Sequence, residues 1–289
     1  MNSMKGTVVT SAYPTLRVHT YVSPHDGWLV TTPIVEGPEK LVIFDGQLLN
    51  AYAEEVAAYA HSLRKPVERI IVSHAHPDHW AGLEVLSREF AQAPIGALPR
   101  VSAQIRAGGE TMLARLSGLF GDAITTRVTV PTGNIELGEQ TVAGARCEFR
   151  ELSDVESDTQ VLVLLPDQKV MMAFDTIYSA TDHVPTLAGH FEHWLSVLAD
   201  LKTMGEYDEI VIGHNAPTDR LAIDATAAYL YEARQIYARS KDAASYAGNL
   251  KAAFPDRAMP GFVDLSATLL YMTRPSTAAW ETEELISGQ

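Results

Sequence analysis

The sequence has a single cysteine, a shortage of basic residues and no long apolar run, and each shortage excludes a class of protein. Cys147 is the only cysteine among 289 residues, so no disulfide can form within the chain. No segment approaches the roughly 18 apolar residues that cross a bilayer. Met1–Gly6 does not lead into an apolar segment, so no secretory signal is visible. These absences predict a cytoplasmic protein without a membrane partner.

The charge balance disfavours nucleic acids as partners. The chain has 22 basic and 36 acidic residues, and its formal net charge of −14 repels phosphate backbones. Hydrophobic residues make up 46% of the sequence, enough for a substantial core. We find no internal repeat or linker, and we therefore predict one domain over residues 1–289 with a helical portion at about 219–289. The sequence carries no signal of oligomeric state.

Three histidines and one aspartate follow the apolar run Arg69–Val72 within six positions. They are His74, His76, Asp78 and His79, and their nitrogen and oxygen donors suit divalent transition metals. In extended backbone His74 and His76 point the same way and can grip one ion. After the turn at the following proline, Asp78 and His79 can face a second ion, at the spacing of about 3.5–4 Å that two-metal sites use. The alternative is a solvated polar loop.

This motif resembles the His-x-His-x-Asp-His signature of the metallo-β-lactamase superfamily. The resemblance continues in order along residues 16 to 216, and it implies an α/β (α+β) fold, a four-layer αββα sandwich with metals at one edge of its two sheets. Three further strands end in residues to which the resemblance assigns roles. Asp45 would hold the histidine motif in place, Asp175 would bridge two metals, and His214 would bind the second metal.

The sequence departs from the family pattern at one ligand. No histidine lies between His79 and His183, and counting back from the strand at 160–165 puts Glu156 at the family's histidine position. Glu156 is the predicted substitute, as in the alkylsulfatase branch, with Asp154 and Asp158 as fallbacks. A glutamate ligand makes the donor set harder, so manganese or iron become options beside zinc for the two divalent ions. The alternative is an acidic surface turn beside a site with one metal or none.

Periodicity predicts strands and helices that agree with a sandwich. Asn50 is expected to cap a helix over 51–63, and a strand at 67–72 precedes a helix at 81–90. A helix over 104–119 is expected to be interrupted at Gly108-Gly109. The remaining predictions are strands at 16–22, 28–35, 40–44 and within 127–173, and helices at 188–204, 219–240 and within 241–272. The apolar segment 112–120 is either buried core or a lid over the pocket.

Two further residues are candidates for contact with substrate. Tyr178 follows Asp175 by three positions, and lactone-hydrolysing relatives suggest that it steadies a developing oxyanion; ordinary packing is the alternative. His183 is a candidate proton donor to a leaving group, with a solvated loop histidine as the alternative. Asp78 is predicted to orient the nucleophile as well as to bind metal.

Together these features predict a dinuclear metal-dependent hydrolase that uses a bridging hydroxide. The expected substrate is a small ester, lactone or thioester with an apolar portion. A sulfuric-ester hydrolase is the nearest alternative. A diiron oxidoreductase and a catalytically silent ligand-binding relative are the alternatives from other classes.

Overall fold

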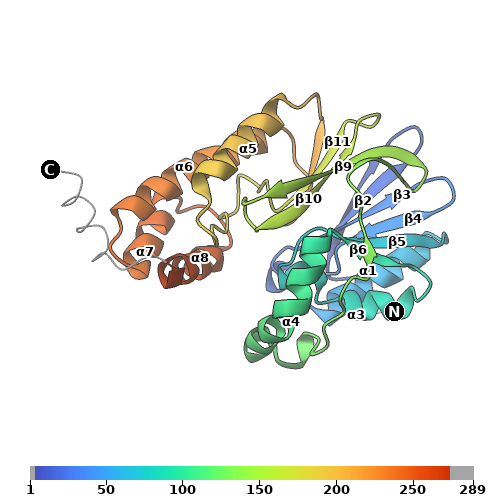
Figure 1. Cartoon of the computed structure of the whole chain (residues 1–289), viewed down its shortest axis with the longest axis horizontal. Helices are drawn as coiled ribbons and strands as arrows, with labels where there is room; N and C mark the ends of the chain where they lie inside the picture. The colour runs from blue at the N-terminus through green and yellow to red at the C-terminus, as the bar shows by residue number, and fades with distance from the viewer. Residues whose placement is uncertain (1–3, 274–289) are drawn as a thin grey trace.

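Two β-sheets lie face to face in the computed structural model, which describes residues 4–273 (Figure 1). The larger sheet has the order β1-β2-β3-β4-β5-β6-β7. Its strands are β1 (Thr7–Ala12), β2 (Arg17–Val22), β3 (Thr31–Glu36), β4 (Leu41–Phe44), β5 (Val67–Val72), β6 (Ile95–Ala97) and β7 (Gly133–Asn134). The smaller sheet has the order β12-β11-β10-β9-β8. Its strands are β8 (Gly138–Val142), β9 (Ala145–Ser153), β10 (Thr159–Leu165), β11 (Val170–Phe174) and β12 (Glu209–Ile212).

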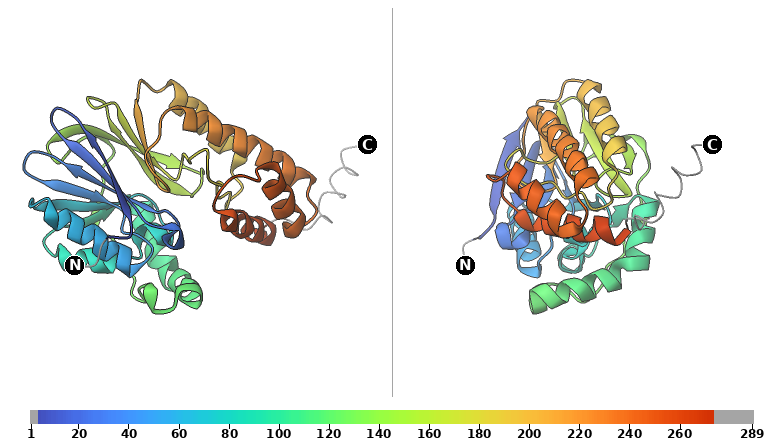
Figure 2. Two further views of the ribbon diagram at one scale, coloured as in Figure 1. Left: turned by 180° about the vertical axis from the view of Figure 1, so that it is seen from behind. Right: turned by 90° about the vertical axis from the view of Figure 1, so that its left-hand side faces the viewer.

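Helices cover the outer faces of both sheets. On the larger sheet they are α1 (Asn50–Ser62), α2 (Pro77–Trp80), α3 (Leu83–Glu89) and α4 (Pro99–Phe120). The smaller sheet is followed by α5 (Phe191–Thr203), α6 (Leu221–Arg239), α7 (Ala243–Ala253) and α8 (Pro260–Thr273). From behind, α5 to α8 form the end of the molecule opposite the N-terminal strands (Figure 2). The predicted four-layer αββα sandwich is confirmed. The single domain over 1–289 stays a prediction, and its last residues, 274–289, lie outside the described part.

The strands of the smaller sheet alternate between two buried layers. In β10, Val161 and Val163 join the core cluster shared with the larger sheet, whereas Leu162 and Leu164 join the cluster that includes Trp194 of α5. Successive side chains of a strand point to opposite faces, so a strand with both faces covered must be apolar throughout. This explains why the run Thr159–Leu165 is buried at every position.

The strand directions bring separated segments to one edge of the two sheets. β4 and β5 are parallel neighbours in the larger sheet, and β11 and β12 are parallel neighbours in the smaller one. Parallel neighbours end at the same edge, so the residues after these strands gather there. Asp45 follows β4, the histidine motif follows β5, Asp175 follows β11 and His214 comes two residues after β12.

Two details of the predicted helices are wrong. The first helix begins at Asn50 itself, and the extended residue before it, Leu49, makes no side-chain cap. The helix α4 runs without interruption through Gly108 and Gly109. A Cβ on Gly109 would lie 2.9 Å from a methyl of Val128, so the missing side chain lets the helix pack closely. Such packing offsets the cost of a helical glycine, about 1 kcal/mol.

Candidate metal centre

The histidine motif forms a compact turn at the end of β5. His74 Nε2 and His76 Nδ1 lie 3.1 Å apart, as expected for alternate positions of an extended chain. Pro77 then starts α2, which places Asp78 and His79 on its first turn. The indole of Trp80 donates to the Ala75 carbonyl at 2.9 Å and so ties the helix back to the extended residues.

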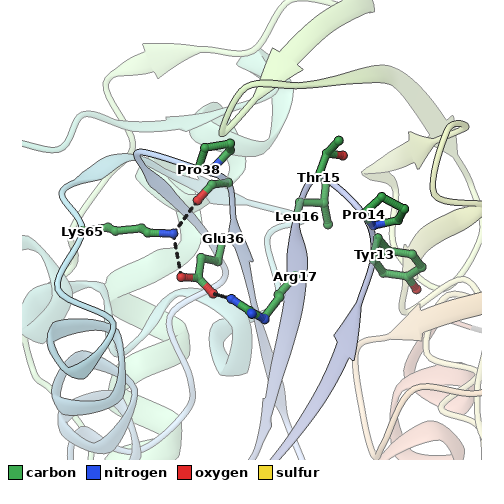
Figure 3. A pocket seen from close by; sticks show the side chains of 9 residues that line it. Tyr13, Pro14, Thr15, Leu16, Arg17, Glu36, Pro38 and Lys65 are labelled. Carbon is green, nitrogen blue, oxygen red and sulfur yellow. Dashed lines mark hydrogen bonds and ion pairs between the residues drawn. The ribbon is translucent and has the colours of Figure 1, made fainter.

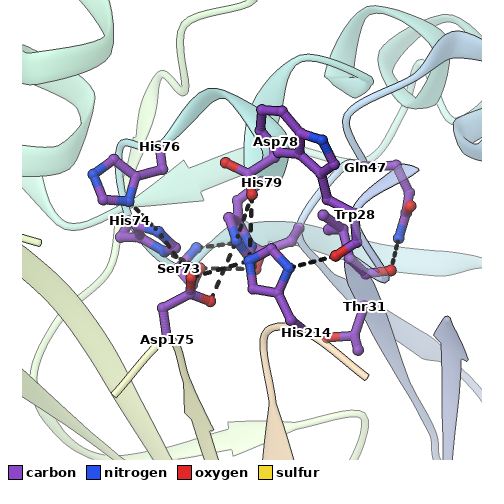
Figure 4. Close-up of polar contacts among 12 residues, drawn as sticks. Trp28, Thr31, Gln47, Ser73, His74, His76, Asp78, His79, Asp175 and His214 are labelled. Atoms are coloured by element: carbon purple, nitrogen blue, oxygen red, sulfur yellow. Dashed lines mark hydrogen bonds and ion pairs between the residues drawn. The ribbon is translucent and has the colours of Figure 1, made fainter. Parts of the chain in front are cut away.

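Asp175 lies between the two halves of this cluster. Its Oδ1 is 3.3 Å from His79 Nε2, and its Oδ2 is 3.2 Å from His214 Nε2 and 4.0 Å from His74 Nε2 (Figure 4). Asp78 Oδ2 closes the group at 3.3 Å from His214 Nε2. The carboxylate thus faces His74 on one side of the cluster and His79 and His214 on the other, which is the position that a bridging ligand needs.

Glu156 stands beside the first pair of histidines, in the turn between β9 and β10. Its Oε2 lies 3.0 Å from His76 Nδ1 and 3.7 Å from His74 Nε2, and its side chain is buried. The fallback residues Asp154 and Asp158 are exposed and face His190 at 3.8 and 3.9 Å instead. Among the three acidic candidates, the geometry therefore favours Glu156.

The outer nitrogens of three histidines are held by the protein. His79 Nδ1 donates to Asp45 Oδ2 at 2.9 Å, and His214 Nδ1 donates to the Trp28 carbonyl at 2.7 Å. Ser73 Oγ donates to Asp45 Oδ2 at 2.7 Å, which leaves its oxygen to accept from His74 Nδ1 at 2.9 Å. Each bond puts the proton on Nδ1 and leaves the Nε2 lone pair facing the centre.

The residues fit divalent metal ions. Three overlapping groups have ligand atoms within 4.8 Å of one another. They are His74, His76 and Glu156; His74, His79 and Asp175; and Asp78, His79 and His214. Within the described residues, buried His79 Nε2, Glu156 Oε2 and Asp175 Oδ1 have no hydrogen-bond partner, an arrangement that buried polar atoms rarely keep without a ligand. No Lys or Arg of the described chain pairs with these carboxylates, so their charge is balanced by protons on the histidines or by bound cations.

The electrostatics of the cluster agree with a cation site. Burial lowers the pKa of His76 and the Glu156 carboxylate raises it, and the balance leaves it at about 9. Burial also lowers the pKa of His214, but the Asp175 carboxylate raises it more, and the balance leaves it at about 10. The carboxylates thus attract positive charge strongly, and metal ions would compete with these protons.

Tyr178 and His183 are buried and do not face the substrate pocket. The Tyr178 hydroxyl donates to Asp175 Oδ2 at 2.6 Å, and its ring stacks on His214 at 5.8 Å. His183 is buried, and its Nδ1 lies 2.9 Å from the Tyr229 hydroxyl. Burial and the charge of Arg257 lower the pKa of His183 to about 4. Neither residue lines the pocket described next. The hydrogen bond of Tyr178 indicates that it holds Asp175 in place. The catalytic roles of both residues stay predictions.

A large apolar pocket opens over the cluster. Its volume is about 770 Å³, and its lining includes His76, Asp78, Glu156, Asp175 and His214. The walls are side chains of α4 and α8, and they include Met112 and Leu116 from the segment 112–120. That segment therefore borders the pocket. Part of it also packs on the core, because Leu113 is buried.

Sequence reasoning missed several pocket residues. Trp28 lines the pocket, has the left-handed φ of 63° and packs against Phe120 and Phe262 at 5.5 and 6.2 Å. Phe262 also contacts the His214 ring at 5.2 Å. Arg115 of α4 is a further lining residue. No local pattern marks these positions, since they converge from distant parts of the chain.

A second, smaller pocket lies near the turn between β1 and β2 (Figure 3). Its volume is about 160 Å³, and Glu36 is its buried acidic residue. Lys65 at 2.8 Å, His19 at 3.0 Å and Arg17 at 3.3 Å surround this carboxylate. Burial raises the pKa of Glu36, but these partners outweigh it and lower the pKa to about 2. Its charge is already satisfied within the protein, and the pocket has no unpaired group for a ligand's charge.

The chain belongs to the metallo-beta-lactamase superfamily, whose family model matches residues 25–214. Its fold is similar to that of a metallo-beta-lactamase from Pontibacter korlensis, with a TM-score of 0.62, 15% identity, and coverage of 78% of this chain and 99% of that one. The mono-zinc form of the metallo-beta-lactamase FIM-1 from Pseudomonas aeruginosa has a TM-score of 0.63 and 16% identity, over 81% of this chain and 98% of that one.

Sequence relatives among characterised proteins are sulfatases. An alkyl/aryl-sulfatase of Saccharomyces cerevisiae is 27% identical over 50% of this chain and 27% of its own length. An (R)-specific secondary-alkylsulfatase of a Pseudomonas species is 26% identical over 71% of this chain and 36% of its own length. The chain thus spans about a third or less of these relatives. Within residues 4–273, no helix combines the length and hydrophobicity of a membrane span.

Gly213 supplies a test of the site that leaves all proposed ligands in place. A Cβ at this position would lie 1.7 Å from Asp175 Oδ1 and 3.1 Å from His79 Cε1. We expect Gly213→Ala to displace the Asp175 carboxylate and to weaken metal binding by about 10- to 100-fold, the range for disturbed ligand orientation. Metal titration measures the effect. Gly248→Ala is the matched control because a Cβ there meets nothing within 4 Å. Unchanged metal affinity in Gly213→Ala would contradict the placement of Asp175.

Proposed function

We propose that the protein is a dinuclear metal-dependent hydrolase that cleaves an ester bond in a small molecule with an apolar portion. The observation that carries this proposal is the position of Asp175 between two groups of ligand atoms at the floor of an apolar pocket. Membership of the metallo-beta-lactamase superfamily supports hydrolysis as the reaction class.

The ligands divide into two sets that share Asp175. His74, His76 and Glu156 would hold one ion, and Asp78, His79 and His214 would hold the other. When bound, such ions lower the pKa of water and polarise the oxygen of the scissile bond. Zinc is our first choice, and the two carboxylates that bind singly, Asp78 and Glu156, keep manganese and iron as options.

Side chains of the protein would transfer protons and hold the metal ligands in place. Asp78 lines the pocket with its carboxylate next to the ligand set, so it is the group placed to accept a proton from the attacking water and pass it to the leaving group. Tyr178 fixes Asp175 by its short hydrogen bond. The walls of α4 and α8 exclude water from the apolar portion of the substrate.

The substrate is an ester of either a carboxylic acid or sulfuric acid. A carboxylic ester, lactone or thioester is the first, since a carbonyl carbon is attacked readily by an activated water. A sulfuric ester is the second, and both the alkylsulfatase relatives and the glutamate in the ligand set favour it. Cytoplasmic location and the exclusion of nucleic acids stay predictions.

Metal removal and parallel assays test this proposal. We expect chelation to abolish hydrolysis, and zinc or manganese to restore it at two equivalents per chain. Purified protein should be assayed with a p-nitrophenyl ester and with an alkyl sulfate of equal chain length. Preference for one substrate identifies the acid component. Iron with visible absorption and no hydrolysis of either substrate would instead indicate a redox centre, and protein that binds no metal would indicate a silent ligand-binding relative; either result contradicts the proposed hydrolase.

A further inference from the structure

The wall of the large pocket contains one cationic side chain, Arg115. Among the described residues that line the pocket, it is the only lysine or arginine. It lies on α4 with Met112, Leu116 and Leu119, at the spacing of three and four residues that puts side chains on one helical face. Within residues 4–273, Arg115 makes no ion pair, and it is exposed.

The pocket around Arg115 is otherwise poor in positive charge. Apart from the two histidines of the metal centre, the other ionisable lining residues are acidic, and the whole chain has a formal net charge of −14. An anionic substrate group would therefore be repelled throughout the pocket except near the metal ions and near Arg115. A planar guanidinium binds carboxylates and related anions with two parallel hydrogen bonds.

Arg115 is separated from the metal centre along the helix. The part of α4 near the turn that carries Glu156 includes Gln104, which donates at 3.1 Å to Asp158 Oδ2, two residues from Glu156, and Gly108 lines the pocket one turn farther along. Arg115 comes seven residues after Gly108, which is about two turns and about 10 Å along the helix at 1.5 Å per residue. The wall opposite consists of Phe262, Leu265 and Leu269 of α8, all apolar.

We propose that Arg115 binds a second anionic group of the substrate, at the end remote from the scissile bond. The substrate class is then an ester whose reacting end and remote acid are joined by an apolar spacer of about 10 Å. This inference rests on the proposed hydrolase function, because it assumes that the metal centre holds the reacting end. An arginine that merely covers apolar surface with its stem is the alternative.

Matched substrate pairs test the inference in metal-loaded, full-length protein. The first pair is mono-p-nitrophenyl sebacate and p-nitrophenyl decanoate, which differ only in a remote carboxylate in place of a methyl. The second pair is decyl sulfate with and without a terminal carboxylate. We expect Arg115→Met to lower kcat/KM for the carboxylated substrate by about 5- to 20-fold, mainly through KM, and to change the neutral one by less than about twofold. Arg115→Lys should keep part of the preference.

Arg106→Met is the matched control, because Arg106 is an exposed arginine of the same helix that does not line the pocket. The effect at Arg115 should shrink as salt is raised. Equal losses for both members of a pair, or no loss for either, would overturn the remote-anion site while hydrolysis itself persists. Failure of wild-type protein to cleave any of the four substrates would instead count against the proposed function.

Discussion

The Asp175→Ala variant is expected to lose both metal binding and hydrolysis, with kcat/KM reduced by about a thousandfold or more. Asp175 lies between the two ligand sets, because its Oδ2 is 3.2 Å from His214 Nε2 and 4.0 Å from His74 Nε2. Its removal takes the shared ligand from both proposed ions and leaves each of them with three ligands from this chain. Metal content by elemental analysis and initial rates with the better substrate measure the two losses.

Asp167→Ala is the control for this experiment. Asp167 is an exposed aspartate that pairs with Arg146 at 2.8 Å on the surface of the same sheet. It should retain wild-type metal content and rate. Circular dichroism of both variants separates loss of ligand from loss of fold. Two equivalents of metal together with wild-type turnover in Asp175→Ala would refute the shared-ligand arrangement.

The sequence predicted the parts of the site that depend on local spacing and on strand ends. The turn from His74 to His79 is local, because a strand, a proline and one helical turn determine it. Asp175 and His214 were predicted from the resemblance to the superfamily, which places such residues at strand ends, and parallel strands bring these ends to a common edge. The ligand roles of these residues stay predictions, since the structure gives their positions alone.

The pocket could not be predicted from sequence, because its walls come from distant elements. Trp28 belongs to a short turn whose left-handed backbone places its carbonyl on His214 and its ring against Phe262. Each contact joins residues more than 180 positions apart, and no periodicity records them. The glycine pair in α4 failed as a break signal for a similar reason, since tertiary packing against Val128 outweighs local helix propensity.

Glu156 gives the second large expected effect, and the comparison of two substitutions isolates it. Glu156→Gln keeps the shape of the side chain but removes its charge and one good donor oxygen, so we expect the affinity for the first metal to fall by about 100-fold. Glu156→His restores a donor of the type that the superfamily pattern places here. It should keep two metals bound and shift the preference toward zinc over manganese by about tenfold. Competition between the two metals, followed by elemental analysis, measures both effects.

The Glu156 carboxylate faces the first pair of histidines. Its buried Oε2 lies 3.0 Å from His76 Nδ1 and 3.7 Å from His74 Nε2, so the oxygen is positioned beside the other donors of the first proposed ion. Asp158→Asn is the control, because Asp158 lies two residues away and is exposed. If Glu156 were only part of an acidic turn and bound no metal, both Glu156 variants and Asp158→Asn would bind metals like the wild type. A loss in Glu156→Gln that Glu156→His reverses requires the side chain at this position to be a metal donor.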